Sequence, residues 1–360
     1  MSCNYEVIHG LDFTEEEIQE SLKRGGLLSL ELEFTKKCNL RCVYCYSEAG
    51  ESVKDELTPK EIMGVIDQAA ELGARKIILL GGGEPLLYDR LHDIVDYIFH
   101  KGIEQTVFTN GFLLDSNVAR FLFERDVSVV LKHNSFTRRV QDSLAGVEGA
   151  YVKIQKALAN LMEAGYPEGG RQLGIQTVVV KQNIEEIPSM WVWARKMGFI
   201  PYFEVLTMQG RAKKHQEIVV SSEEIKRVFS ELRDIDRREF GIEWVSHPTI
   251  ASFTCKRHLY SSLVNSQGYV QPCTGIDLFV GNVRQQPLAE ILGNSRVISD
   301  LRNIYNKIEG ACRTCELSNI CYGCRGNAYQ LTGNYLASDP ACWLASGQKN
   351  GWRKKSWGAG

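Results

Sequence analysis

The stretch Thr35-Lys-Lys-Cys-Asn-Leu-Arg-Cys-Val-Tyr-Cys-Tyr46 is the most informative part of the chain, because it brings Cys38, Cys42 and Cys45 together. Residues 28–34, just before it, alternate apolar and polar side chains as a β-strand does. The three thiols should therefore lie on a loop at the C-terminal end of a strand. Three cysteines can hold a [4Fe–4S] cluster and leave one iron free for another ligand. The alternatives are a zinc site, which usually needs a fourth ligand that is not nearby, and reduced cysteines without metal.

The composition is that of an ordinary globular protein. With 360 residues, 44% of them hydrophobic and 24% charged, the chain is long enough for one large domain and a smaller one. The net charge of −2 gives no indication of a nucleic-acid or membrane partner. Residues 1–27 are polar and lack the apolar core of a signal peptide, and no apolar run has the length of a membrane span. We therefore expect a cytoplasmic protein in a reducing, anaerobic setting.

The cysteines fall into two groups. The chain has eleven of them, and without a secretion signal they favour metal or redox chemistry over a disulfide framework. Cys3 stands alone, three lie at 38–45, and seven lie between 255 and 342. The long cysteine-free stretch between the groups separates two metal-binding regions, and we place a domain boundary near 215–250.

The first half of the chain alternates strand-like and helix-like segments. One helix has a clear start, with Thr58 as N-cap, Pro59 at the first helical position and Glu61 three residues after the cap, and Gly73 is its expected end. Strands that alternate with helices predict an α/β fold with a parallel sheet curled into a barrel or part of one. Polar side chains at the C-terminal ends of the strands would then face the active site. The expected strands are 28–34, 76–80, 105–109, 127–132, 174–180 and 202–206.

A second motif, Gly81-Gly-Gly-Glu-Pro85, follows the apolar strand at 76–80 directly. Glycines allow a backbone to approach a ligand closely, and the exposed carbonyls could accept hydrogen bonds from an ammonium group. A plain Gly-Pro turn is the alternative.

The cysteine triplet, with Tyr44 before its last member, and the Gly-Gly-Glu-Pro run resemble the signature of the radical S-adenosylmethionine (radical SAM) enzymes. The resemblance implies a partial (β/α)6 barrel like a TIM barrel, in which the free iron chelates the amino and carboxylate groups of S-adenosylmethionine. One electron from the cluster would cleave the sulfonium to a 5′-deoxyadenosyl radical, which abstracts a hydrogen atom from substrate. An electron donor such as flavodoxin or ferredoxin would reduce the cluster.

The resemblance also implies cofactor contacts. Gly82, Gly83 and Glu84 would bind the amino group of S-adenosylmethionine, and Asn134 and Ser135, after the fourth strand, would contact its ribose or carboxylate. A turn or capping role is the alternative for Asn134 and Ser135. Further along, Gly210-Arg-Ala212 resembles the closing strand and turn of the family barrel, and strand alternation predicts that His133 is structural or faces solvent. We name no acid–base residue beyond Glu204, a candidate because it should face the barrel interior.

The C-terminal cysteines exceed the needs of one zinc ion. Two CxxC pairs, at 312–315 and 321–324, lie closer together than the knuckles of a zinc ribbon usually do. Seven thiolates fit two clusters with interleaved ligands better than one tetrahedral metal. The residues are Cys255, Cys273, Cys312, Cys315, Cys321, Cys324 and Cys342.

This layout resembles the SPASM extension of radical SAM enzymes, which carries two auxiliary [4Fe–4S] clusters, so that three clusters are expected in all. The resemblance assigns Cys255, Cys273 and Cys324 to the first auxiliary cluster, and residues 312, 315, 321 and 342 to the second. The step from residue 321 to 324 departs from the family's Cys-x3-Cys spacing. The first cluster is one cysteine short, so its fourth iron would be open or would bind His258, the substrate or another group.

We therefore expect five segments: a lead-in at 1–27, a radical SAM barrel at 28–215, a helical bridge at 216–250, a SPASM domain at 251–345 and a tail at 346–360. The expected function is radical oxidation, crosslinking or epimerisation of a peptide or protein. The same chemistry on a small molecule, such as a sugar, an aminoglycoside-type compound or a tetrapyrrole, is the alternative. The short lead-in has no room for a leader-binding domain, so a separate protein would supply one. An electron-transfer protein or a regulatory sensor of S-adenosylmethionine would bind clusters without this turnover.

Overall fold

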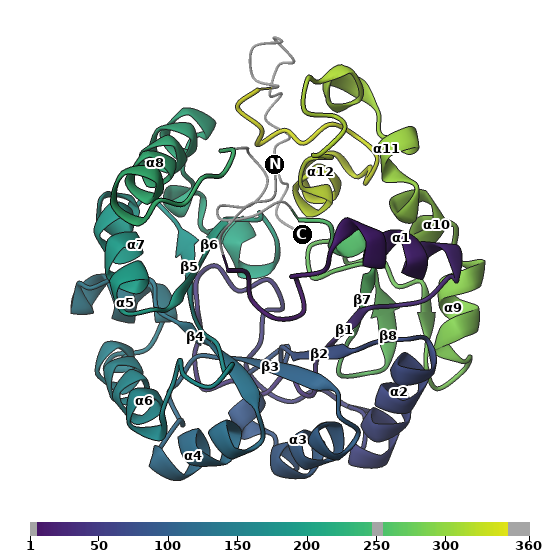
Figure 1. Ribbon diagram of the computed structural model, residues 1–360, viewed down its shortest axis with the longest axis horizontal. Coiled ribbons are helices and arrows are strands. Elements are labelled where there is room, and N and C mark those ends of the chain that lie inside the picture. Colours follow the sequence, from purple (N-terminus) through teal and green to yellow (C-terminus); the bar gives the residue numbers. More distant parts are fainter. Residues whose placement is uncertain (1–5, 247–254, 345–360) are drawn as a thin grey trace.

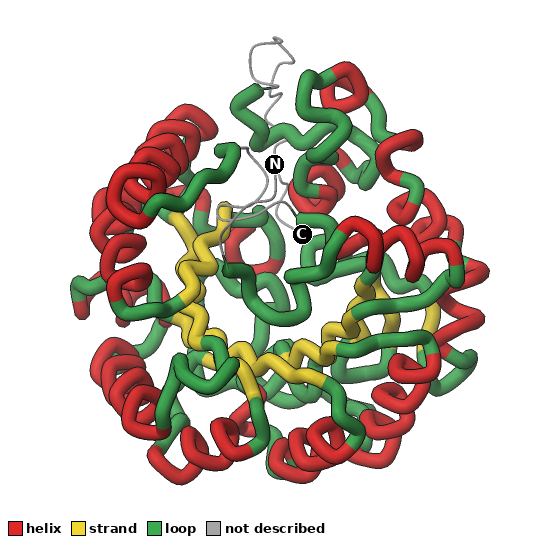
Figure 2. The backbone as a smooth tube through the Cα atoms, in the orientation of Figure 1, coloured by secondary structure: helices red, strands yellow, loops and turns green. Residues whose placement is uncertain are grey.

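The computed structural model describes residues 6–246 and 255–344. Its centre is one curved sheet with the strand order β6-β5-β4-β3-β2-β1-β7-β8-β9, and helices cover its outer face (Figure 1). The sheet forms an open arc and does not close on itself, as the tube view shows (Figure 2). The strands are β1 Ser29–Leu32, β2 Lys76–Leu79, β3 Glu104–Thr109, β4 Val127–Lys132, β5 Leu173–Val179, β6 Ile200–Val205, β7 Ser261–Val264, β8 Tyr269–Gln271 and β9 Gly281–Asn282.

Helices alternate with β1 to β6 as the sequence predicts, so the partial barrel is confirmed. The strands β1 to β6 pair in parallel throughout. The helices are α1 Glu15–Lys23, α2 Pro59–Glu71, α3 Leu91–His100, α4 Ser116–Glu124, α5 Arg138–Ala145, α6 Ala150–Ala164, α7 Ile187–Lys196, α8 Ser222–Ile235, α9 Leu288–Asn294, α10 Arg296–Arg302, α11 Ile304–Lys307 and α12 Arg325–Thr332. None of these described helices combines the length and the apolar character that a membrane crossing requires.

Because side chains alternate along the strands, an apolar layer lies between the sheet and the helices, and polar side chains face the barrel interior. On β1, Leu30 and Leu32 pack in the main core between the sheet and the helices, whereas the buried Glu31 between them lies on the opposite face of the strand. The same alternation on β4 places Val129 and Leu131 in the core and leaves Lys132 on the other face. Because successive side chains of a strand point to opposite faces, the polar members are directed into the barrel.

The start of α2 is confirmed in detail. The Thr58 hydroxyl accepts a hydrogen bond from the Glu61 backbone N–H, the Glu61 carboxylate accepts one from the Thr58 N–H, and Pro59 opens the helix. Gly73, just after the helix, has a left-handed φ of 96°. This reciprocal cap satisfies two backbone donors that would otherwise lack partners.

The lead-in before β1 packs against the barrel strands. Ile8 is buried in a small apolar cluster with Val130 and Tyr202. The backbone N–H of His9 donates to the Gln172 side chain at 2.8 Å, and the carbonyl of His9 accepts from the Thr106 hydroxyl at 3.2 Å. Residues 6–11 therefore fill the barrel interior near the N-terminal ends of its strands.

The C-terminal half extends the barrel sheet, which the cysteine spacing does not predict. Strand β7 pairs in parallel with β1, residue for residue from Ser29–Ser261 to Leu32–Val264, and β8 and β9 follow antiparallel. The expected bridge at 216–250 contains α8, whose Val228 packs into the main core. Residues 247–254, Cys3 and the expected tail at 346–360 lie outside the described residues.

Candidate functional site

The loop after β1 carries the cysteine triplet, and hydrogen bonds with Gly50 and with the side chain of the distant Arg211 hold its backbone in place. The N–H of Cys38 donates to the Gly50 carbonyl at 2.8 Å. The Arg211 guanidinium donates through Nε to the Cys42 carbonyl and through both terminal nitrogens to the Ala49 carbonyl, each at 2.9 Å. Gly210 has a φ of 55°, and a Cβ there would lie 2.4 Å from the Cys45 carbonyl oxygen. The expected Gly-Arg-Ala turn therefore clamps the cysteine loop.

The three thiols are near enough to interact electrostatically, but no group of three or more cysteine, histidine or acidic side chains in the described part of the chain stands at the spacing of a metal site. Burial raises the pKa of the Cys38 thiol to about 12, and the nearby Cys42 and Cys45 thiols add to this effect. Burial also raises the pKa of Cys42, with Cys45 as the next cause. Thiols this close disfavour one another as thiolates until a bound cation compensates them, and a metal deprotonates the cysteines that coordinate it. Three cysteines brought to one [4Fe–4S] cluster would hold three of its irons and leave the fourth free.

The glycine motif after β2 lies against the cysteine loop. The N–H of Gly83 donates to the Thr35 carbonyl at 2.6 Å, and that of Glu84 to the Lys37 carbonyl at 2.9 Å. Gly82 has a φ of 73°, and its carbonyl accepts from the Ser47 hydroxyl. A Cβ at Gly83 would lie 2.1 Å from the Lys37 carbonyl oxygen, so the backbones touch where any other residue would separate them.

Glu84 anchors the motif to the end of β3. Its carboxylate accepts from the Thr109 hydroxyl at 2.5 Å, from the Asn110 N–H at 2.8 Å and from the Leu86 N–H at 3.2 Å. Glu84 is 1% exposed, and burial raises the pKa of its carboxyl to about 7 although the three donors act against the rise. The Asn110 amide also lies 3.9 Å from the Cys38 sulfur, so one residue connects Glu84 with the cluster loop.

Asn134 and Ser135 lie near the triplet, but their side chains already have protein partners. The Asn134 amide donates to the Tyr44 hydroxyl at 2.7 Å and accepts from the Val178 N–H at 2.9 Å. The Ser135 hydroxyl donates to the Glu186 carboxylate at 2.9 Å. Both residues are fully buried. Their predicted contact with S-adenosylmethionine stays a prediction, and in this arrangement Asn134 orients Tyr44, the aromatic residue between two of the cysteines.

The polar groups that face the barrel interior come from β4, β5 and β6. Lys132 stacks its ammonium 5.0 Å from the Tyr44 ring, and its charge interacts with Glu204. The Glu204 carboxylate accepts from the Gln176 amide at 2.6 Å. Burial lowers the pKa of Lys132, and Glu204, Cys42 and Cys45 oppose this shift. The structure therefore brings Glu204 to the interior as predicted and adds Lys132, which strand alternation alone could have indicated.

A second interior pair joins the barrel to the C-terminal half. The Arg257 guanidinium donates to Glu31 of β1 at 2.7 Å and to the Tyr202 hydroxyl of β6 at 3.2 Å. Glu31 is 2% exposed and burial raises its pKa, while the Arg257 charge acts in the opposite direction. Sequence reasoning missed Arg257, and its position two residues after Cys255 is the available signal.

The C-terminal cysteines lie on turns around α12. Burial raises the pKa of Cys273, and the Cys324 and Cys255 thiols are near enough to contribute, which fits the expected grouping of these three. Cys312 lies instead beside Gly323, with its sulfur 3.6 Å from the position of a Cβ there. The remaining expected ligands, at 315, 321 and 342, lie in the same turn region. The assignment of individual cysteines to two clusters stays a prediction.

His258 lies close to this region. Its ring is buried, its centroid is 6.0 Å from that of Tyr322, and its Nδ1 has no hydrogen-bond partner among the described residues. Burial lowers its pKa to about 3, and the nearby Arg257 and Arg325 act in the same direction. A neutral imidazole is the form that can bind a metal, so His258 remains a candidate fourth ligand.

Comparisons with known proteins agree with this site. A sequence model of the Radical SAM superfamily matches residues 32–191, and one of the SPASM iron–sulfur cluster-binding domain matches residues 255–316. Two relatives come from Methanosarcina barkeri. Its AdoMet-dependent heme synthase is 29% identical over 343 residues, which is 88% of this chain and 96% of that protein. Its Fe-coproporphyrin III synthase is 28% identical and covers 86% of both chains.

The chain is also similar to a protein named as a peptide cyclase and to a solved structure. A PqqA peptide cyclase from Granulibacter bethesdensis is 26% identical over 337 residues, which is 89% of this chain and 87% of that protein. Among solved structures, Streptococcus suis SuiB bound to S-adenosylmethionine superimposes with a TM-score of 0.71 at 18% identity, covering 91% of this chain and 81% of that one. This structural likeness concerns the fold.

Residues 32–191 therefore form a Radical SAM domain and residues 255–316 a SPASM domain, so the chain carries the two domains of a SPASM-type radical SAM enzyme. Its C-terminal part is the SPASM extension, as the cysteine pattern predicts.

Proposed function

We propose that this enzyme holds three [4Fe–4S] clusters and uses them with S-adenosylmethionine to oxidise a tetrapyrrole. The radical cluster is bound by Cys38, Cys42 and Cys45. The first auxiliary cluster is bound by Cys255, Cys273 and Cys324, and the second by Cys312, Cys315, Cys321 and Cys342. A one-electron carrier such as flavodoxin or ferredoxin supplies the reducing electron, and the oxygen-sensitive clusters suit a reducing, anaerobic cytoplasm.

The residues around the triplet position the reactants. A cluster held by the triplet would supply the electron that cleaves the S-adenosylmethionine sulfonium, so that a hydrogen atom could be taken from the substrate, and an auxiliary cluster would accept the electron that the resulting substrate radical gives up. The carbonyls of Gly82 and Gly83 lie on the loop that touches the triplet and accept from the amino group of S-adenosylmethionine. Glu84 holds that loop against β3 through its three hydrogen bonds. Glu204 lies inside the barrel beside Lys132, where it can accept a proton from the oxidised substrate.

Lys132 is the observation that carries the choice of a tetrapyrrole. Its ammonium lies inside the barrel, against Tyr44 of the cysteine loop. Tetrapyrroles of the heme pathway carry several carboxylate side chains, and a desolvated ammonium attracts a carboxylate strongly. The relatives named as heme and Fe-coproporphyrin III synthases are similar to this chain over both of its halves, which supports the same choice.

A peptide is the second candidate substrate. The PqqA peptide cyclase supports it, because its similarity also runs through both halves of the chain. In that case a separate leader-binding protein would deliver the peptide, and the interior charges at Lys132 and Glu204 would bind its polar side chains.

The first test is a metal count followed by a turnover assay. Anaerobically reconstituted protein should contain about twelve iron and twelve sulfide per chain and no zinc. Four iron with one zinc would keep the radical cluster and contradict the two auxiliary ones. Iron coproporphyrin III is then added with S-adenosylmethionine and a reductant, and 5′-deoxyadenosine and altered tetrapyrrole are measured. Deoxyadenosine formation that does not respond to the tetrapyrrole would contradict this substrate class.

A matched lysine pair tests the proposed carboxylate contact. Lys132→Met should raise the KM for the tetrapyrrole by about tenfold or more, the loss of one charge-assisted hydrogen bond, with unchanged iron content. Lys153→Met is the control, because Lys153 also stacks on an aromatic ring, that of Phe112 at 5.4 Å, but is exposed on α6. Equal KM values in the two variants would remove Lys132 from substrate binding.

A further inference from the structure

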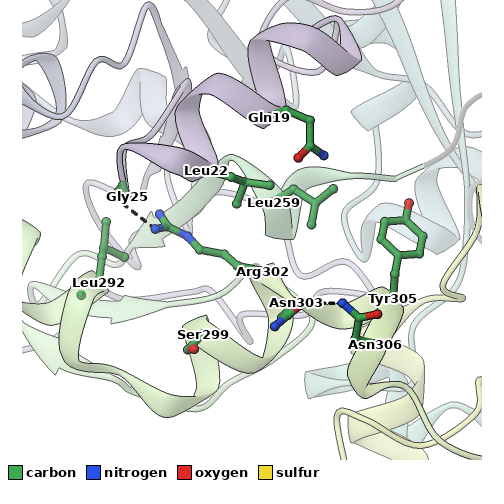
Figure 3. A pocket seen from close by; sticks show the side chains of 11 residues that line it. Gln19, Leu22, Gly25, Leu259, Leu292, Ser299, Arg302, Asn303, Tyr305 and Asn306 are labelled. Atoms are coloured by element: carbon green, nitrogen blue, oxygen red, sulfur yellow. Dashed lines mark hydrogen bonds between the residues drawn. The ribbon is translucent and has the colours of Figure 1, made fainter.

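A cavity lies where α1 meets α9, α10 and α11 (Figure 3). Its volume is about 550 Å³, enough for a small organic molecule. One wall is apolar and is formed by three leucines: Leu22 of α1, Leu292 of α9, and Leu259 from the turn before β7. Amide, hydroxyl and guanidinium groups form the rest, and the full set is Gln19, Leu22, Gly25, Leu259, Leu292, Gly293, Ser299, Arg302, Asn303, Tyr305 and Asn306.

Arg302 brings an uncompensated positive charge to this cavity. Its guanidinium donates to the carbonyls of Gly25 and Gly26, at 3.2 and 2.8 Å, just past the C-terminal end of α1. Within the part of the chain that the structure describes, no carboxylate pairs with it. Burial lowers its pKa. Arg302 is half-buried, and the partial negative charge of a helix end fixes its guanidinium in place but does not neutralise a full charge.

Arg302 lines the cavity and has donors beyond those that the structure shows in use. Two carbonyls use two of the five N–H groups of the guanidinium. The side chain extends from α10 toward Gly25 between Leu22 and Leu292, and Gln19 lines the same cavity (Figure 3). A guanidinium fork beside an apolar wall matches a carboxylate joined to an apolar body.

We propose that this cavity is a binding site for an amphipathic monocarboxylate, with the carboxylate on Arg302 and the apolar body against the leucine wall. The cavity also touches the support of the auxiliary cysteines. Tyr305 lines it and packs edge to face on Tyr322, at 5.5 Å between ring centroids, and Tyr322 directly follows Cys321 in the chain. A bound ligand would therefore press on the turn that carries the cysteines of residues 321 and 324.

The test titrates octanoate, as the probe, into the reconstituted protein and measures binding by isothermal titration calorimetry. Saturable binding of octanoate, with no binding of octanamide at the same concentration, is expected because the amide lacks the charge. Arg302→Gln should weaken octanoate about tenfold or more. Arg296→Gln is the matched control, since this arginine is exposed on the same helix and already pairs with Asp300 at 3.7 Å, and it should leave the affinity unchanged.

A blocking variant keeps the test decisive if Arg302→Gln damages the fold. Gly293 lines the cavity near the end of α9, and a Cβ added there would meet no atom within 4 Å. Because Gly293 lines the cavity, Gly293→Leu should narrow it, leave the iron content unchanged and weaken octanoate binding about tenfold or more. Octanoate that fails to bind the unmodified protein, that binds no better than octanamide, or that binds Gly293→Leu normally would each overturn the proposal.

Discussion

Replacing Gly83 with alanine should separate the glycine motif from the cysteine loop. The added Cβ would lie 2.1 Å from the Lys37 carbonyl oxygen and 2.7 Å from its carbon, whereas ordinary contacts begin at 3.4 Å. The obstacle is backbone, so it cannot rotate aside, and the two loops must move apart by more than 1 Å. That movement breaks the hydrogen bonds from the Gly83 N–H to Thr35 and from the Glu84 N–H to Lys37.

The expected cost of Gly83→Ala follows from these contacts. Two hydrogen bonds contribute about 1 kcal/mol each, and overpacking adds about 1–3 kcal/mol, so the free energy of unfolding should fall by about 3–5 kcal/mol. Urea unfolding of metal-free, reduced protein measures this loss. In reconstituted protein, 5′-deoxyadenosine formation should drop by about a hundredfold or more, because a 1 Å displacement of a positioning loop has effects of this size.

Gly64→Ala is the matched control for this prediction. Gly64 lies inside α2, a Cβ there meets no atom within 4 Å, and alanine favours a helix over glycine by about 1 kcal/mol. This variant should be slightly more stable and fully active. If Gly83→Ala kept both its stability and its rate of S-adenosylmethionine cleavage, the close approach of the two loops could not be what positions the cofactor.

Two further outcomes follow from buried carboxylates. The carboxylate of Asp236 is fully buried and accepts hydrogen bonds from the indoles of Trp191 and Trp244 and from the Arg195 guanidinium. Asp236→Ala should therefore lower the free energy of unfolding, measured in urea, by about 3–5 kcal/mol. Asp234→Ala is the control: this residue forms an exposed ion pair with Arg233, and its loss should cost less than about 1 kcal/mol. Equal losses in the two variants would contradict the assigned network. The raised pKa of Glu84, about 7 against an ordinary 4.5, means that the folded state keeps its proton over an interval where the unfolded state has lost it. Stability of the metal-free protein should therefore fall by about 3 kcal/mol as the pH rises from 4.5 to 7, and Glu84→Gln should remove this fall; an unchanged pH profile in that variant would refute it.

The sequence predicts the barrel well because its signals are local. The pattern predicts each strand from β1 to β6 within a few residues of its place, since an apolar run bounded by turn residues identifies a buried parallel strand. The cap of α2 was expected to the residue, because its hydrogen bonds join groups three positions apart. The cysteine triplet and the glycine motif were equally visible, as both are short runs after a strand.

Long-range pairings were not predictable in the same way. The parallel pairing of β7 with β1 joins segments more than two hundred residues apart, and neither strand's pattern specifies that partner. The ion pair between Arg257 and Glu31 depends on that pairing, so it was missed as well. The family resemblance predicts Asn134 and Ser135 as cofactor contacts from their place after a strand, but their side chains hydrogen-bond to Tyr44 and Glu186, which sequence position does not reveal. Strand alternation could have indicated Lys132, which is not among the predicted site residues.

The register between β1 and β7 has a consequence for how the chain can be divided. The two sequence families that match this protein meet inside one sheet, and the first strand of the barrel provides the backbone partner for the first strand of the SPASM extension. Cut apart, each piece would expose an unpaired strand edge and one half of a buried ion pair. Each piece should therefore be insoluble when it is made alone, and both should become soluble when they are produced together. The two matched domains would then fold as one cooperative unit.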